Sequence, residues 1–330
     1  MRRLARSLIV TGVALAFLYA LAGILLTGPI VVTPPEVTLR IEPDAERLRQ
    51  SVATLCGELA PRDYRHPDSL ARTAEWIAAR LGESGLPVEL QEYTLREGRF
   101  RNVIAVRRGS DPSAGAVVVG AHYDAYGGFP GADDNASGVA VLLELVRTLP
   151  TWVPRETQYF VAFDAEEPPF FGTGDMGSAR FARLLLERGV DVQLMVALDM
   201  VGYYSDEPGS QRFPLPVLRL FYPSRGNFLA VVGDTRSGRW IQRVKSAILA
   251  TRALPVESFR APRWVAGVDW SDHASFRDVG LPGVLVTDTA YQRYAHYHAP
   301  TDTPERLDYA RMARVVLGLH GVLREPEPDD

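Results

Sequence analysis

The chain has 330 residues and a formal net charge of −4, from 36 Lys and Arg residues against 40 Asp and Glu residues. It shows no basic stripe, so the composition argues against nucleic acid as a partner. Cys56 is the only cysteine, which excludes an intrachain disulfide and a cysteine-ligated metal site.

The N-terminus has the pattern of a membrane segment. Residues 1–7 are basic, and Leu8–Val32 follows without a charge, long enough to cross a hydrocarbon core of about 30 Å at about 1.5 Å per residue. Ala20–Ala22 resembles a signal-peptidase site, but the apolar run is longer than the apolar region of an ordinary signal peptide. We predict a transmembrane signal anchor over residues 8–32, with residues 1–7 in the cytoplasm and the rest on the periplasmic or extracellular side.

The remaining chain predicts a linker over residues 33–45, one domain over 46–324 and an acidic tail over 325–330. Apolar residues at helical spacing predict helices, which cover residues 45–59, 69–84, 139–149, 177–188, 236–251 and 309–323. Short apolar or alternating runs predict strands, at residues 88–94, 101–107, 116–120, 157–163, 192–198 and 283–287. This alternation predicts an α/β three-layer sandwich with a central mixed, mostly parallel sheet flanked by helices.

A histidine and several acids follow the predicted strands. His122 and Asp124 come just after the apolar run 116–120, and Gly131-Ala-Asp-Asp134-Asn-Ala-Ser-Gly138 then leads into a helix. Open α/β sheets place ligand sites at the carboxyl ends of their strands. One of the acids in this turn can be explained by helix capping, but that does not account for the whole group.

Two further strands also end in acids. Glu166 and Glu167 follow the strand at 157–163, and Asp199 follows the strand at 192–198. The last strand is followed by the segment 294–303, in which His296 and His298 would point the same way if the backbone were extended. Spacing alone does not choose between these two histidines. Acids and imidazoles gathered at one sheet edge indicate a metal site.

These motifs, in this order, resemble metallopeptidase family twenty-eight, the co-catalytic di-zinc aminopeptidases whose relatives include glutaminyl cyclases. The resemblance covers about residues 46–320. It implies the zinc-dependent exopeptidase fold and two zinc ions per chain. One ion would be held by His122 and Asp199 and the other by Glu167 and His298, with Asp134 bridging both.

The resemblance also implies a mechanism. A metal-bridged hydroxide would hydrolyse the N-terminal peptide bond of a peptide substrate, with Glu166 as the general base. Asp124 would accept the second N–H of the histidine ligand and fix its tautomer. Asp272 and His273, in a Ser-Asp-His sequence, are either residues that support the site or the start of a helix.

Two loops beside the expected ligands bear on specificity. Pro168–Met176 offers Phe170, Phe171 and Met176 either as contacts for a substrate side chain or as a cover over the sheet, and 203–226 is a second insertion. The leading hypothesis is a membrane-anchored zinc aminopeptidase. The alternatives are a glutaminyl cyclase-like aminoacyltransferase with a single zinc and a non-catalytic ectodomain. The sequence does not predict an oligomeric state.

Overall fold

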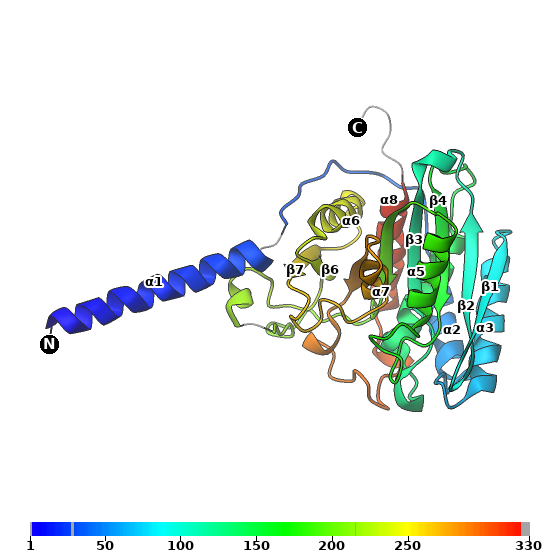
Figure 1. The fold of residues 1–330 in the computed structure, drawn as a ribbon, viewed down its shortest axis with the longest axis horizontal. Coiled ribbons are helices and arrows are strands. Elements are labelled where there is room, and N and C mark those ends of the chain that lie inside the picture. Colours follow the sequence, from blue (N-terminus) through cyan, green and yellow to red (C-terminus); the bar gives the residue numbers. More distant parts are fainter. Residues whose placement is uncertain (1, 28–29, 215, 325–330) are drawn as a thin grey trace.

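The computed structural model describes residues 2–27, 30–214 and 216–324. An eight-stranded sheet in the order β1-β2-β4-β3-β5-β8-β6-β7 forms the centre of the molecule (Figure 1). Its strands are β1 Val88–Leu95, β2 Gly98–Arg107, β3 Ala116–His122, β4 Thr157–Phe163, β5 Val192–Leu198, β6 Leu229–Asp234, β7 Val256–Ala261 and β8 Val284–Thr287. Four of the neighbouring pairs are parallel and three are antiparallel, as expected for a mixed sheet.

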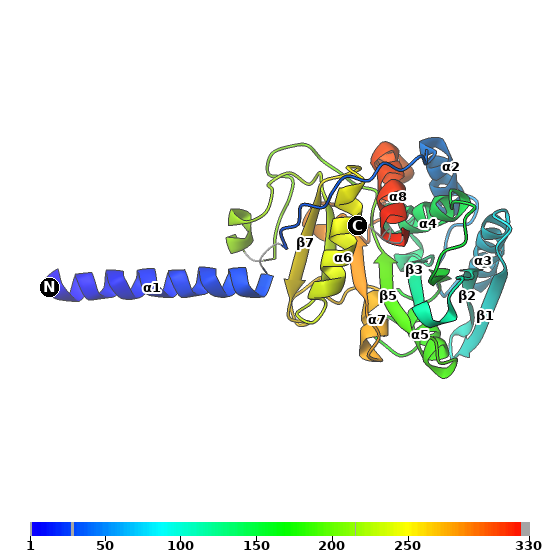
Figure 2. The ribbon, with the colours of Figure 1, turned by 90° about the horizontal axis from the view of Figure 1, so that it is seen from above.

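Helices cover both faces of the sheet, which confirms the layered α/β architecture (Figure 2). The helices of the body are α2 Ala45–Cys56, α3 Pro67–Gly82, α4 Gly138–Arg147, α5 Gly177–Glu187, α6 Gly238–Ala250, α7 His273–Asp278 and α8 Tyr309–Leu323. One apolar core lies between the sheet and α2, α3, α4, α6 and α8. A second core, on the opposite face, contains residues of α5 and α7.

The central strands explain why the functional edge is buried. Every residue of β3 is buried, and β3 pairs in parallel with β4 and β5. Strands covered on both faces need continuous apolar sequences, which is the pattern of these three segments. Because the three strands run in parallel, the chain leaves each of them at the same edge of the sheet.

The N-terminal helix α1, Arg2–Thr27, projects from the body (Figure 1). Its described apolar side chains are exposed; Ile9, Val10 and Phe17 are each at least 65% accessible. Among the described residues, no helix meets the length and apolarity needed to span a membrane, so the predicted anchor over 8–32 is not confirmed. Residues 28–29 of that range, and the predicted tail 325–330, lie outside the described residues.

The segment after α1 lies along the body without regular secondary structure up to α2. The Ile30 amide donates to Ser258 Oγ at 2.8 Å, and the Val37 amide donates to the Ala250 carbonyl at 2.8 Å. These two hydrogen bonds therefore hold the segment after α1 against the edge strand β7 and the end of α6.

Candidate metal centre

His122 is the last residue of β3, which runs two residues further than the predicted strand at 116–120, and its ring is buried. Its Nδ1 lies 3.4 Å from Asp124 Oδ1 and 3.2 Å from the Asp124 carbonyl oxygen. Its Nε2 points the other way, towards Asp134 and Asp199. The ring is therefore held at one nitrogen and offers the other to the site.

Asp134 lies in a wide turn, Ala132–Ser137, rather than directly at the start of α4. Asp302 holds this turn, because its carboxylate accepts the amides of Asp133 at 2.9 Å and Asp134 at 3.1 Å. The N-cap residue of α4 is Ser137, which makes no side-chain capping bond, so the capping role expected for one of the acids is not found. The Gly138 amide donates instead to Asn135 Oδ1 at 3.0 Å. The sequence had suggested no role for Asp302, although it lies in the same segment as His298.

Glu166 and Glu167 follow β4, and Asp124 fixes the backbone of both. The Glu166 amide donates to Asp124 Oδ1 at 3.1 Å and the Glu167 amide donates to Oδ2 at 3.0 Å. Asp124 thus touches three members of the site, whereas the sequence had indicated only its contact with His122.

His298 lies in the loop after β8. Its ring is stacked between Tyr126, with centroids 4.0 Å apart, and Tyr297, with centroids 3.9 Å apart. His296 points elsewhere and its Nδ1 lies 2.8 Å from Thr301 Oγ1. The structure therefore places His298, and not His296, beside the acids.

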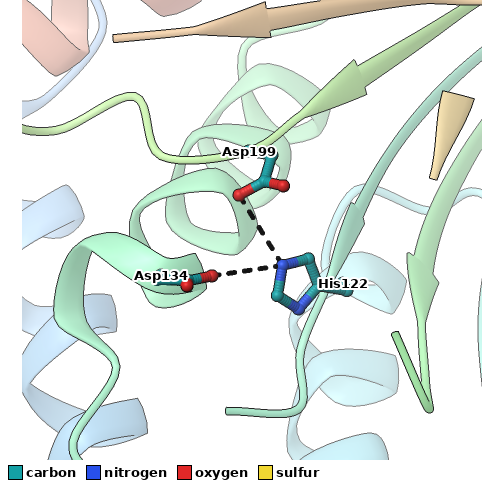
Figure 3. A group of neighbouring side chains, drawn as sticks. All are labelled: His122, Asp134 and Asp199. Atoms are coloured by element: carbon teal, nitrogen blue, oxygen red, sulfur yellow. Dashed lines mark ion pairs between the residues drawn. The ribbon is translucent and has the colours of Figure 1, made fainter. Parts of the chain in front are cut away.

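The five residues assigned to metal binding converge as two groups that share Asp134. His122, Asp134 and Asp199 form the first group (Figure 3), and Asp134, Glu167 and His298 form the second; within each, the potential ligand atoms lie within 4.8 Å of one another. His122 Nε2 is 3.4 Å from Asp134 Oδ1 and 3.7 Å from Asp199 Oδ1. His298 Nε2 is 3.1 Å from Asp134 Oδ2 and 3.4 Å from Glu167 Oε2.

These separations fit shared metal ions better than direct hydrogen bonds. Most exceed the usual 2.7–3.2 Å of an N–H···O bond. Two ligands at about 2.0–2.2 Å from one tetrahedral zinc ion are about 3.4 Å apart, which is close to the observed values. Glu167 Oε1 is buried and has no hydrogen-bond partner in the described part of the chain, so an acceptor remains free for a cation.

The electrostatics of the site also favour cations. Burial raises the pKa of Glu166 well above its usual range, and burial together with Asp134 raises the pKa of Glu167 to about 8. Burial would lower the pKa of His298, but Asp134 and Glu167 raise it to about 10. Within the described residues, the only ion pairs of these acids are with histidines. The acids therefore lack a permanent positive partner.

Glu166 belongs to neither group of ligands. Its Oε2 lies 3.9 Å from His122 Nε2, and its side chain lines the same cavity as the ligands. Glu166 is thus an acid beside the ligands that neither group includes.

Asp272 is fully buried just before α7, but its side chain makes no capping hydrogen bond. Neither of its oxygens has a hydrogen-bond partner among the described residues, and burial raises its pKa to about 7. Asp272 therefore stands at the start of α7, as the helix-start interpretation expected, but its side chain does not cap the helix. His273 has a structural contact, with Nε2 at 2.8 Å from the Val268 carbonyl oxygen.

The loops Pro168–Met176 and 203–226 contribute different numbers of residues to the cavity beside the metal centre. Phe171 lines the cavity beside the metal centre, whereas Phe170 packs in the core against Tyr64 and Phe100. Met176 is also buried and does not line the cavity. Phe170 and Met176 therefore cover the sheet and are not placed to contact a substrate side chain. The second insertion, 203–226, contributes several residues to the cavity wall.

The chain is similar to known proteins over most of its length. The family described as Peptidase family M28 matches residues 102–322. A protein of Escherichia coli K12, named Uncharacterized protein YfbL, is 40% identical over 311 residues, which cover 92% of this chain and 94% of that protein.

Two solved structures share the fold. The zinc aminopeptidase BSAP of Bacillus subtilis has a TM-score of 0.67 at 16% identity, covering 86% of this chain and 95% of that one. The glutaminyl cyclase of Porphyromonas gingivalis has a TM-score of 0.65 at 21% identity, covering 85% and 97%. At these identities the likeness concerns the fold alone, so the choice between the two activities depends on the site.

Proposed function

The chain belongs to Peptidase family M28, a family of zinc peptidases, and we propose that it is an aminopeptidase with two zinc ions per chain. His122 and Asp199 would hold one ion, Glu167 and His298 the other, and Asp134 would bridge them. The observation that carries this proposal is that the two Asp134 oxygens face different histidines, with Oδ1 towards His122 and Oδ2 towards His298.

When bound, the two ions would polarise the scissile carbonyl and lower the pKa of a water molecule. The protein's own groups carry the proton transfers. Glu166 is buried beside the ligands, and burial raises its pKa, which suits a general base that works near neutral pH. It would take the proton from the attacking water and return it to the leaving amine. Asp124 would keep His122 oriented and the glutamate backbone in place.

Replacing Glu166 with Gln tests this role because it keeps the shape and removes the base. The purified protein is expected to release the aniline from aminoacyl-anilides in a chelator-sensitive manner. Glu166→Gln should lose about 10²–10⁴-fold in kcat while its metal content stays unchanged. Undiminished activity in this variant would remove Glu166 from the mechanism.

The second candidate is a glutaminyl cyclase-like aminoacyltransferase, which the fold also supports. Metal content separates the two, because the cyclase alternative needs one zinc ion per chain and the peptidase two. Measurement of bound zinc by atomic emission, together with assays of N-terminal glutamine cyclisation and anilide hydrolysis, decides between them. One ion per chain with cyclisation and no hydrolysis would replace our proposal.

We also propose that the enzyme acts at a membrane, on the periplasmic or extracellular side. The basic residues 1–7 and the exposed apolar side chains of α1 support this location, although no described helix meets the criterion for a span. Cell fractionation followed by protease treatment of intact spheroplasts tests it. Recovery of the protein in the cytosolic fraction would refute it.

A further inference from the structure

An apolar cavity of about 280 Å³ leads away from the metal centre. At one end it is lined by Asp134, Glu167 and His298. At the other end its wall includes Phe259 of β7 and Leu218 from the 203–226 insertion. The active site is therefore continuous with a long apolar space.

The face of β6 and β8 that carries Ala230 and Leu285 belongs to the second core. In that core α5 packs against β2, and α7 packs against β5 and the neighbouring β8, so the helical cover lies towards the middle of the sheet. Loop residues such as Phe213 and Tyr291 line the space above these strands instead.

The cavity is longer than a single side chain. Its lining crosses the sheet from Asp199, after β5, over Leu285 of β8 and Ala230 of β6 to Phe259 of β7. Three strand spacings of about 4.8 Å give a span of about 14 Å. This equals about four residues of extended chain, which exceeds the reach of any standard apolar side chain.

The polar groups at the far end are already engaged. Tyr222 donates to the Ser258 carbonyl at 2.7 Å, and Ser258 Oγ accepts the Ile30 amide at 2.8 Å. Glu257 pairs with Lys245 at 3.5 Å. A peptide backbone placed here would leave its own N–H and C=O groups without partners, which is strongly unfavourable. A hydrocarbon chain has no such groups.

We propose that this cavity binds an unbranched aliphatic chain carried next to the scissile amide, so that the preferred substrates are amphiphilic aminoacyl amides. The inference rests on the proposed hydrolytic function and narrows its substrate class. The chain would lie across β8 and β6 with its tip between Leu218 and Phe259, beside the segment that joins the body to α1.

A homologous series of substrates tests the proposal on the full-length protein. One arm uses 2-aminoalkanoyl anilides with chains from alanine to 2-aminodecanoyl, and the other uses alanine N-alkyl amides of matched length. In at least one arm, kcat/KM should rise about fourfold per methylene well beyond the length of leucine. The arm that responds shows which side of the amide carries the chain.

If kcat/KM levels off at leucine or norleucine in both arms, the proposal is overturned, although chelator-sensitive hydrolysis of leucine anilide would still support the peptidase. Absence of all hydrolysis would instead refute the proposed function. The two failures are therefore distinguishable.

A variant that fills the middle of the cavity locates the effect. Ala230→Phe should lower the ratio of kcat/KM between the decanoyl and alanyl substrates at least tenfold. Leu220→Ser is the matched control, because Leu220 lies on the same short helix as Leu218 but is 76% exposed, and it should leave the ratio unchanged. Thermal unfolding checks the fold, and Leu218→Ser replaces Ala230→Phe if that variant is unfolded. An unchanged ratio in a folded cavity variant contradicts the proposal.

Discussion

Replacing Asp124 with Asn tests how the site is held together. The Asp124 carboxylate accepts the Glu166 and Glu167 amides at 3.1 and 3.0 Å and lies 3.4 Å from His122 Nδ1. Asn keeps one acceptor oxygen but places an NH₂ group against the second amide, so one hydrogen bond is lost. A hydrogen bond to a charged group contributes about 1.5–3 kcal/mol, which corresponds to about 10–100-fold in an equilibrium constant.

We therefore expect Asp124→Asn to bind zinc about 10–100-fold more weakly, a range typical for partners of metal ligands. Competition with a chromogenic chelator measures the affinity, and kcat/KM on leucine anilide at saturating zinc measures what remains of the catalytic geometry. The unfolding free energy of the metal-free protein should fall little, because the variant also removes a buried charge.

Asp44→Ala provides the control. Asp44 caps α2 by accepting the amides of Glu46 and Arg47, so its loss should lower the unfolding free energy by about 1 kcal/mol without changing zinc affinity. If Asp124→Asn binds zinc as tightly as the unchanged protein, the proposed positioning role of Asp124 is wrong.

Other predictions concern the second metal and the acid stability of the fold. His298→Ala should reduce bound zinc from two ions to one, measured by atomic emission, whereas His296→Ala should keep both; equal losses would refute the assignment. Burial lowers the pKa of His320 to about 4, below the usual value of about 6.5, so protonation favours the unfolded chain and stability is lost as the pH falls from about 6.5 to 4. Between pH 7 and 5 this protonation lowers the unfolding free energy by about 2 kcal/mol. Urea-unfolding curves recorded at both pH values should show this loss for the unchanged protein but not for His320→Gln. An equal pH dependence in the two proteins would contradict the prediction.

The sequence predicted the central strands and most helices because their apolar runs are continuous or strongly periodic. It missed β6 and β7, although Leu229–Asp234 is an apolar run and Val256–Ala261 alternates in polarity. Both lie after the insertion 203–226, in a part of the chain where the boundaries of an element are poorly marked. The cavity was missed with them, since these two strands form part of its lining.

The candidate ligands could be named because each follows a recognisable strand or belongs to a motif. The supporting contacts could not. Asp302 is separated from Asp133 by 169 positions, and only folding shows that it accepts that residue's amide. The choice between His296 and His298 likewise depends on the path of the loop, in which His298 has a positive φ of 53°, so the alternation assumed for an extended segment does not apply.

The location of the acids links the stability of the fold to its function. Asp124, Asp134, Glu166, Glu167 and Asp199 are all buried or nearly so at one sheet edge, and burying carboxylates without cations costs several kcal/mol per ion. The metal-free protein limits this cost by holding protons, as the raised pKa values of Glu166 and Glu167 indicate. Ligands must lose their protons to bind zinc, so metal binding and proton release are coupled here. The same burial keeps the pKa of Glu166, which is not a proposed ligand, high enough for a general base. The burial of carboxylates that destabilises the metal-free protein is therefore also what the proposed chemistry requires.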